Sequence, residues 1–94
     1  MTVKPMLTTN GNRAKDQSIL TDHRTGTTYF QSYQSIIVRI ERKMPEFYWT
    51  VYLDKRLWDC SKTTGKYRNI FLGESKRDTM KKIKSGEYLL VNLN

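Results

Sequence analysis

The pair Gly65-Lys66 raises the question of phosphate chemistry, because Gly-Lys pairs occur in phosphate-binding loops. A P-loop needs a glycine four to five residues upstream and a Ser or Thr directly after the lysine. In this chain Cys60 and Ser61 stand at the upstream positions, and Tyr67 follows the lysine. The sequence therefore excludes a nucleotide-hydrolysing loop of this type.

Basic side chains are the second feature with chemical meaning. Lys62, Lys66 and Arg68 surround the expected start of a helix, where exposed amides can hold an anion, although simple capping is the plainer interpretation. Further cations follow within one expected helix: Lys76, Arg77, Lys81, Lys82 and Lys84. With only Asp78 among them, they exceed what the helix dipole needs. We expect this basic surface to contact phosphates or an acidic protein.

Covalent and metal chemistry have little support in the sequence. Cys60 follows Asp59, whose negative charge disfavours the thiolate, and His23 is the single histidine. These residues provide no catalytic or metal-ligating group, so we expect no enzyme activity, no metal site and no cofactor. We expect Cys60 to be a small buried hydrophobic residue. Asp54 and Asp59 are expected to cap backbone amides or form salt bridges.

Tyrosines provide the remaining candidate chemistry. Alternation along the expected strands can place several of them on one strand face with Arg39, a platform on which the bases of a single strand stack. These residues are Tyr29, Tyr33, Tyr48 and Tyr52. Packing within a small core is the alternative, because aromatic residues also dominate the cores of small domains.

The composition limits both the fold and the partner. The 94 residues fit one domain, and 37% hydrophobic residues suffice for one compact core. Seventeen Lys and Arg against nine Asp and Glu give a net charge of +8, which favours polyanionic partners. No apolar run approaches the roughly 18 residues of a membrane span. The N-terminus lacks the apolar region of a signal peptide, so we expect a cytoplasmic protein without membrane contact.

Three segments show the alternation of strands. Residues 28–41 and 47–58 are rich in β-branched and aromatic residues, and a polar break at residues 42–46 separates them. Residues 87–93 close the chain as a third strand. Residues 1–27 are rich in Thr, Asn and Gly with scattered apolar residues, so we expect an extended or flexible N-terminal arm.

Two short helices are expected before the last strand. A stripe at helical spacing indicates the first: Tyr67, Ile70 and Phe71. Hydroxyl residues before this stripe and Gly73 after it support a helix over residues 63–72, with a strand hairpin as the alternative. In the second helix, within residues 74–86, Met80 and Ile83 are expected to face inward.

These elements predict an α+β fold. A small three-stranded antiparallel sheet carries two short helices on one face, and the N-terminal arm extends from it. In this interpretation the arm comprises residues 1–27, and residues 28–94 form a single compact α+β domain.

Several of these residues also form a pattern: a Ser-Tyr strand entry, then Trp-Asp-x-Ser-x-Thr-Thr, an aromatic residue and Phe-Leu. They are Ser32-Tyr33, Trp58-Asp59, Ser61, Thr63-Thr64, Tyr67 and Phe71-Leu72. The pattern resembles a small domain family of unknown function found in bacteriophages and bacterial mobile elements. Cys60 stands where that family usually has an aromatic residue. The resemblance implies a phage origin and a non-enzymatic accessory role in the cytoplasm of the bacterial host or in the virion.

We therefore expect a phage-encoded accessory protein that binds nucleic acid, DNA rather than RNA, through a basic helical face. The expected contact residues are Lys62, Lys66, Arg68, Lys76, Arg77, Lys81, Lys82 and Lys84. An inhibitor directed at an acidic host protein is the first alternative. A minor virion component anchored by the N-terminal arm is the second.

Overall fold

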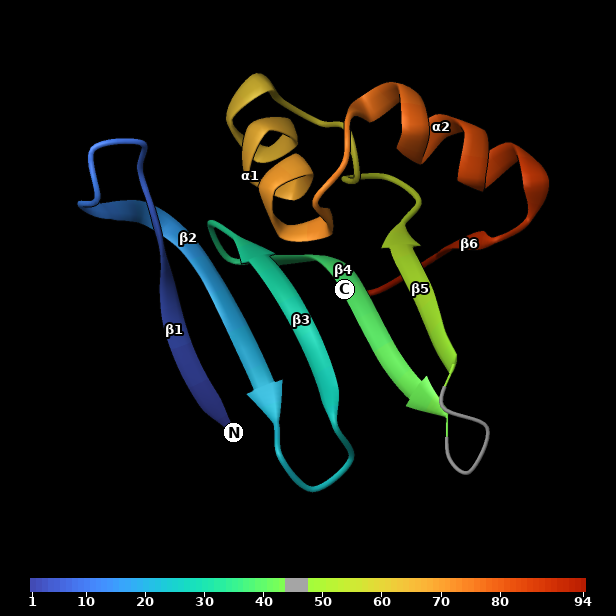
Figure 1. Ribbon diagram of the computed structural model, residues 1–94, viewed down its shortest axis with the longest axis horizontal. Helices are drawn as coiled ribbons and strands as arrows, with labels where there is room; N and C mark the ends of the chain where they lie inside the picture. Colours follow the sequence, from blue (N-terminus) through green and yellow to red (C-terminus); the bar gives the residue numbers. More distant parts are fainter. Residues whose placement is uncertain (44–47) are drawn as a thin grey trace.

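The computed structural model describes residues 1–43 and 48–94, which form a six-stranded sheet and two helices (Figure 1). The strands follow one another across the sheet in chain order, and the first five are antiparallel. The last strand runs parallel to the fifth because two helices carry the chain back first. The elements are β1 (Thr2–Leu7), β2 (Arg13–Asp22), β3 (Thr27–Ser32), β4 (Ser35–Lys43), β5 (Tyr48–Asp54), α1 (Lys62–Leu72), α2 (Lys76–Ser85) and β6 (Tyr88–Val91).

The expected three-stranded antiparallel sheet is wrong, because the described residues form six strands in a mixed sheet. Residues 1–27, which we expected to form an arm, supply β1 and β2. Gly11 (φ 81°) and Gly26 (φ 76°) lie in the two hairpin turns that join β1 to β2 and β2 to β3. The segments of β1 and β2 do not show a clear alternation of apolar and polar residues, so the sequence did not indicate them as strands.

The second and third predicted strands also differ from the structure at their ends. The predicted break covers residues 42–46. β4 continues through Lys43, and residues 44–46 lie outside the described part of the chain. β5 ends at Asp54, four residues before its predicted end. There the Asp54 carboxylate accepts hydrogen bonds from the amides of Leu57 (3.0 Å) and Leu93 (2.8 Å). The predicted capping role of Asp54 is confirmed.

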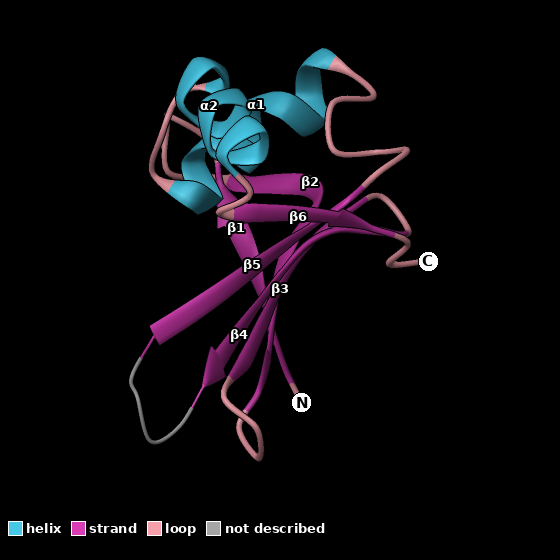
Figure 2. Cartoon of the chain, turned by 90° about the vertical axis from the view of Figure 1, so that its right-hand side faces the viewer, coloured by secondary structure: helices cyan, strands magenta, loops and turns pink. Residues whose placement is uncertain are grey.

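One face of the sheet packs against the helices and contains the core. Phe30 of β3, Val38 of β4 and Leu53 of β5 are fully buried and adjacent in the register. Figure 2 shows both helices on the same side of the sheet. Because side chains alternate along a strand, the neighbours of these core residues point to the opposite side. We call this second side the helix-free face.

The first predicted helix is confirmed as α1, and the hairpin alternative is excluded. The helix ends at Gly73, which adopts a left-handed conformation (φ 69°) that glycine accommodates without strain. Tyr67 is buried, and the Phe71 ring stacks on Phe30 with centroids 5.7 Å apart. Ile70 is 51% exposed, contrary to the predicted stripe. The buried side of α1 includes Arg68, so Ile70 falls on the outer side.

The second predicted helix is confirmed as α2. The Oγ atom of Ser75 accepts a hydrogen bond from the Asp78 amide at 3.2 Å, and Gly86 ends the helix in the left-handed region. Ile83 packs against the core as predicted, but Met80 is 40% exposed. Thr79 takes the inward position because its side chain is fully buried.

Candidate nucleic-acid interface

α1 presents two of the predicted contact residues, Lys62 and Lys66, to solvent. The helix begins after Ser61, whose Oγ atom accepts a hydrogen bond from the Thr64 amide at 3.1 Å. Lys62 and Lys66 are four residues apart and therefore lie on one side of the helix. The Lys66 ammonium lies 5.5 Å from the centroid of the Tyr67 ring. The structure thus places both lysines at the helix entry and on the surface.

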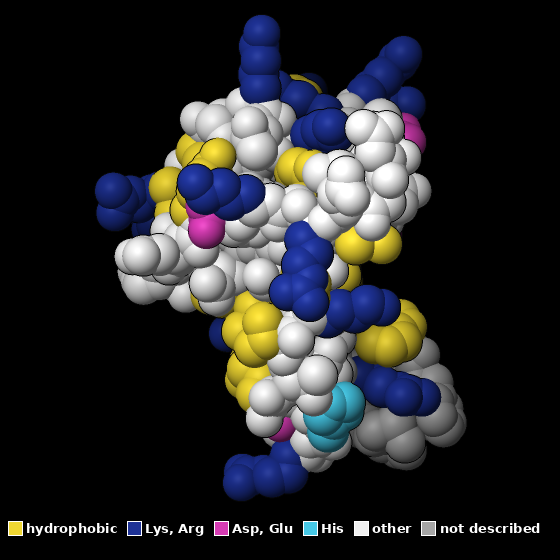
Figure 3. Space-filling model, turned by 90° about the vertical axis from the view of Figure 1, so that its left-hand side faces the viewer, with side chains coloured by type: hydrophobic (Ala, Val, Ile, Leu, Met, Phe, Trp, Pro, Cys, Tyr) yellow, Lys and Arg dark blue, Asp and Glu magenta, His cyan; other side chains and the backbone are white. Residues whose placement is uncertain are grey.

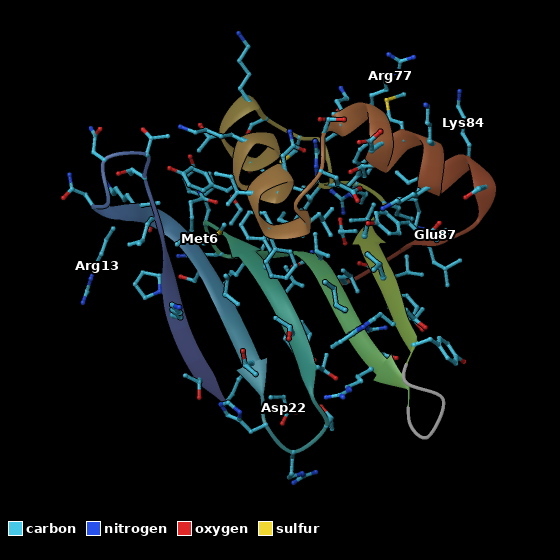
Figure 4. All side chains as sticks on the ribbon, in the orientation of Figure 1. Met6, Arg13, Asp22, Arg77, Lys84 and Glu87 are labelled. Atoms are coloured by element: carbon cyan, nitrogen blue, oxygen red, sulfur yellow. The ribbon has the colours of Figure 1, made fainter. Side chains whose placement is uncertain are left out.

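α2 presents a longer basic stripe on its outer side. Arg77, Lys81 and Lys84 follow a spacing of four and three residues, which aligns them on one helix face, and all three are exposed. Figure 4 shows Arg77 and Lys84 pointing away from the sheet. Together with Lys76 and Met80, these residues line a hollow along the helix. This stripe is therefore accessible to a large partner.

Arg68 was predicted to contact phosphate, but its side chain is only 1% exposed. Its guanidinium donates hydrogen bonds to the backbone oxygen of Trp58, to the Asp59 carboxylate (3.3 Å) and to the Asn69 side-chain oxygen (3.0 Å). It also lies over the Trp58 ring, 5.1 Å from the centroid. Arg68 is therefore a structural residue that joins α1 to the loop before it.

Lys76 remains half exposed but is paired. Its ammonium lies 2.6 Å from the Asp59 carboxylate. This hydrogen bond, with a smaller contribution from Arg68, lowers the pKa of Asp59 below its usual value even though partial burial raises it. The predicted salt-bridging role of Asp59 is confirmed. Lys76 is consequently less available to a phosphate than an unpaired lysine.

Lys82 does not belong to the outer stripe. Its ammonium lies 2.7 Å from the largely buried carboxylate of Glu74, which raises the pKa of Lys82 above its usual value. Thr79 and the Tyr88 hydroxyl (2.8 Å) donate hydrogen bonds to the same carboxylate. Lys82 therefore holds α2 against β6 and does not point toward a partner.

Five predicted contact residues remain exposed without an ion pair within the described chain. We call them the helical cations: Lys62, Lys66, Arg77, Lys81 and Lys84. Lys62 and Lys66 line a second hollow with Ser61, Asp59 and Lys76. Lys76 thus borders both hollows, which connects the cations at the start of α1 with those along α2. Figure 3 shows that other Lys and Arg side chains lie along the β1 side of the molecule.

The predicted tyrosine platform is present in part. Tyr29 and Tyr52 flank Arg39 in one row across β3, β4 and β5 on the helix-free face, and the Arg39 guanidinium lies 4.4 Å from the Tyr52 ring centroid. Tyr33 lies outside this row, in the turn after β3 with a positive φ of 58°. Tyr48 belongs to the outer end of β5 and is 49% exposed.

The row extends further than the sequence predicted. It also includes residues of β1, β2 and β6 that lie in register with the tyrosines: Val3, Leu20 and Leu89. Two of these belong to the segment that we expected to be an arm, so their membership was not foreseeable.

Cys60 is exposed, so the prediction that it is a buried hydrophobic residue is wrong. It lies in the turn between β5 and α1, where the chain runs over the surface. His23 contacts the Thr2 hydroxyl at 2.6 Å. Among residues 1–43 and 48–94, no group of His, Cys, Asp and Glu is suited to hold a metal ion. Within the same residues no helix has the length and apolar character needed to cross a membrane.

The fold and the basic surface define a small α+β protein with a mixed sheet and helices on one face. A family model described as a family of unknown function (DUF8033) matches residues 1–87. The chain therefore belongs to this family, and the match includes the segment that forms β1 and β2. No curated protein and no solved structure matches the chain.

Proposed function

We propose that the protein is a non-enzymatic DNA-binding protein that contacts phosphates with the helical cations. The observation that carries this proposal is that all five are exposed and unpaired within the described chain, while the two carboxylates beside the helix starts are engaged by other cations. Asp59 and Glu74 are held by Arg68, Lys76 and Lys82. The surface therefore has an excess of positive charge that an anionic partner would neutralise.

Duplex DNA suits this surface better than unpaired RNA. Sequence-specific RNA binding relies on unstacked bases that stack on aromatic side chains. Tyr67 and Tyr88, which lie near the helices, are buried, and the two basic hollows are lined by no aromatic residue. Phosphate contacts need only exposed cations at suitable spacing. An accessory role in a bacteriophage or mobile element, implied by the sequence resemblance, is part of the proposal.

The number of cations sets the expected salt dependence. Each neutralised phosphate contributes about 0.9 to the slope of log affinity against log salt, so five contacts give a slope of about −4.5. Paired Lys82 and buried Arg68 should not contribute. A fluorescence anisotropy titration of a labelled duplex at several salt concentrations measures this slope.

A triple variant tests the location of the interface. Neutralising Arg77, Lys81 and Lys84 with glutamine should weaken binding and reduce the slope by about 2.7, because three phosphate contacts are lost. The matched control removes the same charge from β2 and the turn after it: Arg13→Gln, Lys15→Gln and Arg24→Gln, all exposed.

The control separates a local interface from an effect of net charge. We expect its slope to equal that of the unaltered protein. An equal loss in both triple variants would contradict the proposed surface. Absence of duplex binding even at about 50 mM salt, where phosphate contacts are strong, would overturn DNA binding itself.

A further inference from the structure

The helix-free face carries a row of side chains across all six strands of the described sheet, and five of the six are apolar or aromatic. In the register the row comprises Val3, Leu20, Tyr29, Arg39, Tyr52 and Leu89. Val3 is 62% exposed and Leu89 is 41% exposed, although both are apolar. Apolar and aromatic side chains gathered on one uncovered sheet face indicate an interaction site.

The charges on this face argue against a nucleic-acid strand. Arg39 is paired with Glu41 at 3.1 Å, and Asp22 lies on the same face by strand alternation. Along the row itself, the Arg39–Glu41 pair and Asp22 therefore leave no excess of positive charge, and Arg13, which pairs with Leu7, lies at the far end of β2. A stacking platform for single strands needs a positively charged groove that follows the phosphates.

We propose that the helix-free face is the interface of a homodimer in which two sheets pack face to face. A two-fold axis brings the same surface onto itself, so an apolar row meets an apolar row. Each copy also carries a neutral Arg39–Glu41 pair, which can exchange partners across the axis. This inference does not depend on DNA binding.

The position of the helices makes such a dimer compatible with the high net charge. Both helices lie on the other side of the sheet (Figure 2), so the helical cations of the two copies point in opposite directions. Packed sheets are about 10 Å apart, and each sheet adds further distance to its helices. This separation exceeds the Debye length of about 8 Å at physiological salt, so the cations of the two copies are screened from each other.

The size of the face suits a reversible dimer. Six strands at about 4.8 Å spacing and about six residues along each strand give a surface of roughly 24 by 20 Å. Two such surfaces bury on the order of 1,000 Å² in total, which is the lower range of specific interfaces. We therefore expect association that depends on concentration.

Light scattering after size-exclusion chromatography, over a series of protein concentrations, tests the proposal. The 11.2 kDa chain should approach twice its monomer mass as concentration rises. Leu89→Lys places like charges near one another at the interface and should shift the protein to the monomer. The matched control is Ile70→Lys, which adds the same charge at an exposed apolar position on α1. It should leave the dimer intact.

Circular dichroism of both variants establishes that they remain folded, and Val3→Lys provides a second interface variant if Leu89→Lys does not fold. A wild-type protein that stays monomeric at every concentration overturns the proposal, as does equal dissociation by Ile70→Lys. An oligo-dT titration adds one further outcome. A monomer that binds oligo-dT, and loses this binding in Tyr52→Ala, would instead assign the face to single-stranded DNA.

Discussion

Arg68 shows how a residue of the expected chemical type can serve a different purpose. Its side chain is 1% exposed and donates hydrogen bonds to Trp58, Asp59 and Asn69. Arginine suits this position because its planar guanidinium donates several hydrogen bonds in fixed directions. A Cβ atom at the neighbouring Gly65 would lie 3.6 Å from the guanidinium, an ordinary van der Waals distance, so the Arg68 position does not require glycine there.

Arg68→Gln is expected to destabilise the protein by about 3 kcal/mol, because it leaves the buried acceptors around the side chain unpaired. Urea unfolding followed by circular dichroism measures the change. Lys66→Gln, on the same helix but exposed, should change the free energy of unfolding by less than about 0.5 kcal/mol. Equal stability of the two variants would contradict the structural role of Arg68.

Sequence reasoning identified the exposed cations but could not separate them from the buried one. Lys62, Lys66 and Arg68 fall within one helical segment, and their residue types are equally compatible with a surface. Helical phase is the distinguishing signal, because Arg68 lies one turn after the buried Thr64 while Lys66 lies one turn after the exposed Lys62. The partner of Arg68, the Trp58 carbonyl, lies ten residues earlier and cannot be inferred from spacing.

At the scale of elements, the Glu74 carboxylate ties α2 to β6. It accepts hydrogen bonds from Lys82 and Thr79 of α2 and from Tyr88 at the start of β6. Burial raises the pKa of Glu74, but these three donors together outweigh burial and lower it below 4.5. Burial and the nearby carboxylate raise the pKa of Tyr88 to about 12. The ionised carboxylate therefore stabilises the packing of β6.

Glu74→Gln should lower the free energy of unfolding by about 2 kcal/mol at neutral pH, since it removes charge-assisted hydrogen bonds. Because the pKa of Glu74 is lowered on folding, its stabilising effect is present above about pH 4.5 and is lost as pH falls through the folded pKa. The difference between wild type and variant should therefore shrink on acidification.

Urea unfolding of both proteins between neutral pH and pH 3 measures this difference. Asp54 and Asp59 also have lowered pKa values, but both are present in wild type and variant, so their contributions cancel. A difference that stays constant with pH would contradict the role assigned to the ionised Glu74.

The two helices could be predicted from the sequence, whereas the sheet could be predicted only in part. Ser61, Gly73, Ser75 and Gly86 mark helix ends through contacts within a few residues, so both helices were predictable. Strand pairing is non-local and leaves weaker signals. β2 includes Asp16 with a positive φ of 59°, a distortion that interrupts its alternation.

At the scale of the whole molecule, β1 and β2 are integral to the core. Met6 and Ala14 are each 5% exposed and belong to the same hydrophobic cluster as Phe30. The edge of β3 is covered by β2 over six residue pairs, from Gln17–Ser32 to Asp22–Thr27. Removing the first two strands would expose this edge and the apolar side chains behind it.

A chain that begins at Thr27 is therefore expected to be unfolded or aggregated, whereas removal of a flexible arm would leave the melting temperature unchanged. Thermal melting followed by circular dichroism, with size-exclusion chromatography, distinguishes these results. Met6→Ala provides a graded comparison within the intact chain. It should cost about 2–5 kcal/mol, as for other buried large side chains replaced by alanine.

Exposed Val3 on the same strand serves as the matched control, and Val3→Ala should change stability far less than Met6→Ala. Because Val3 also belongs to the proposed dimer interface, this comparison is made at a protein concentration where the wild type is monomeric. The sequence alone did not predict that Met6 is buried, because the residues two positions away on either side are Lys4 and Thr8, so no apolar alternation includes it. A shortened chain that melts like the full protein would show that the sheet folds from β3 onward, and β1 and β2 would then be an attached arm after all.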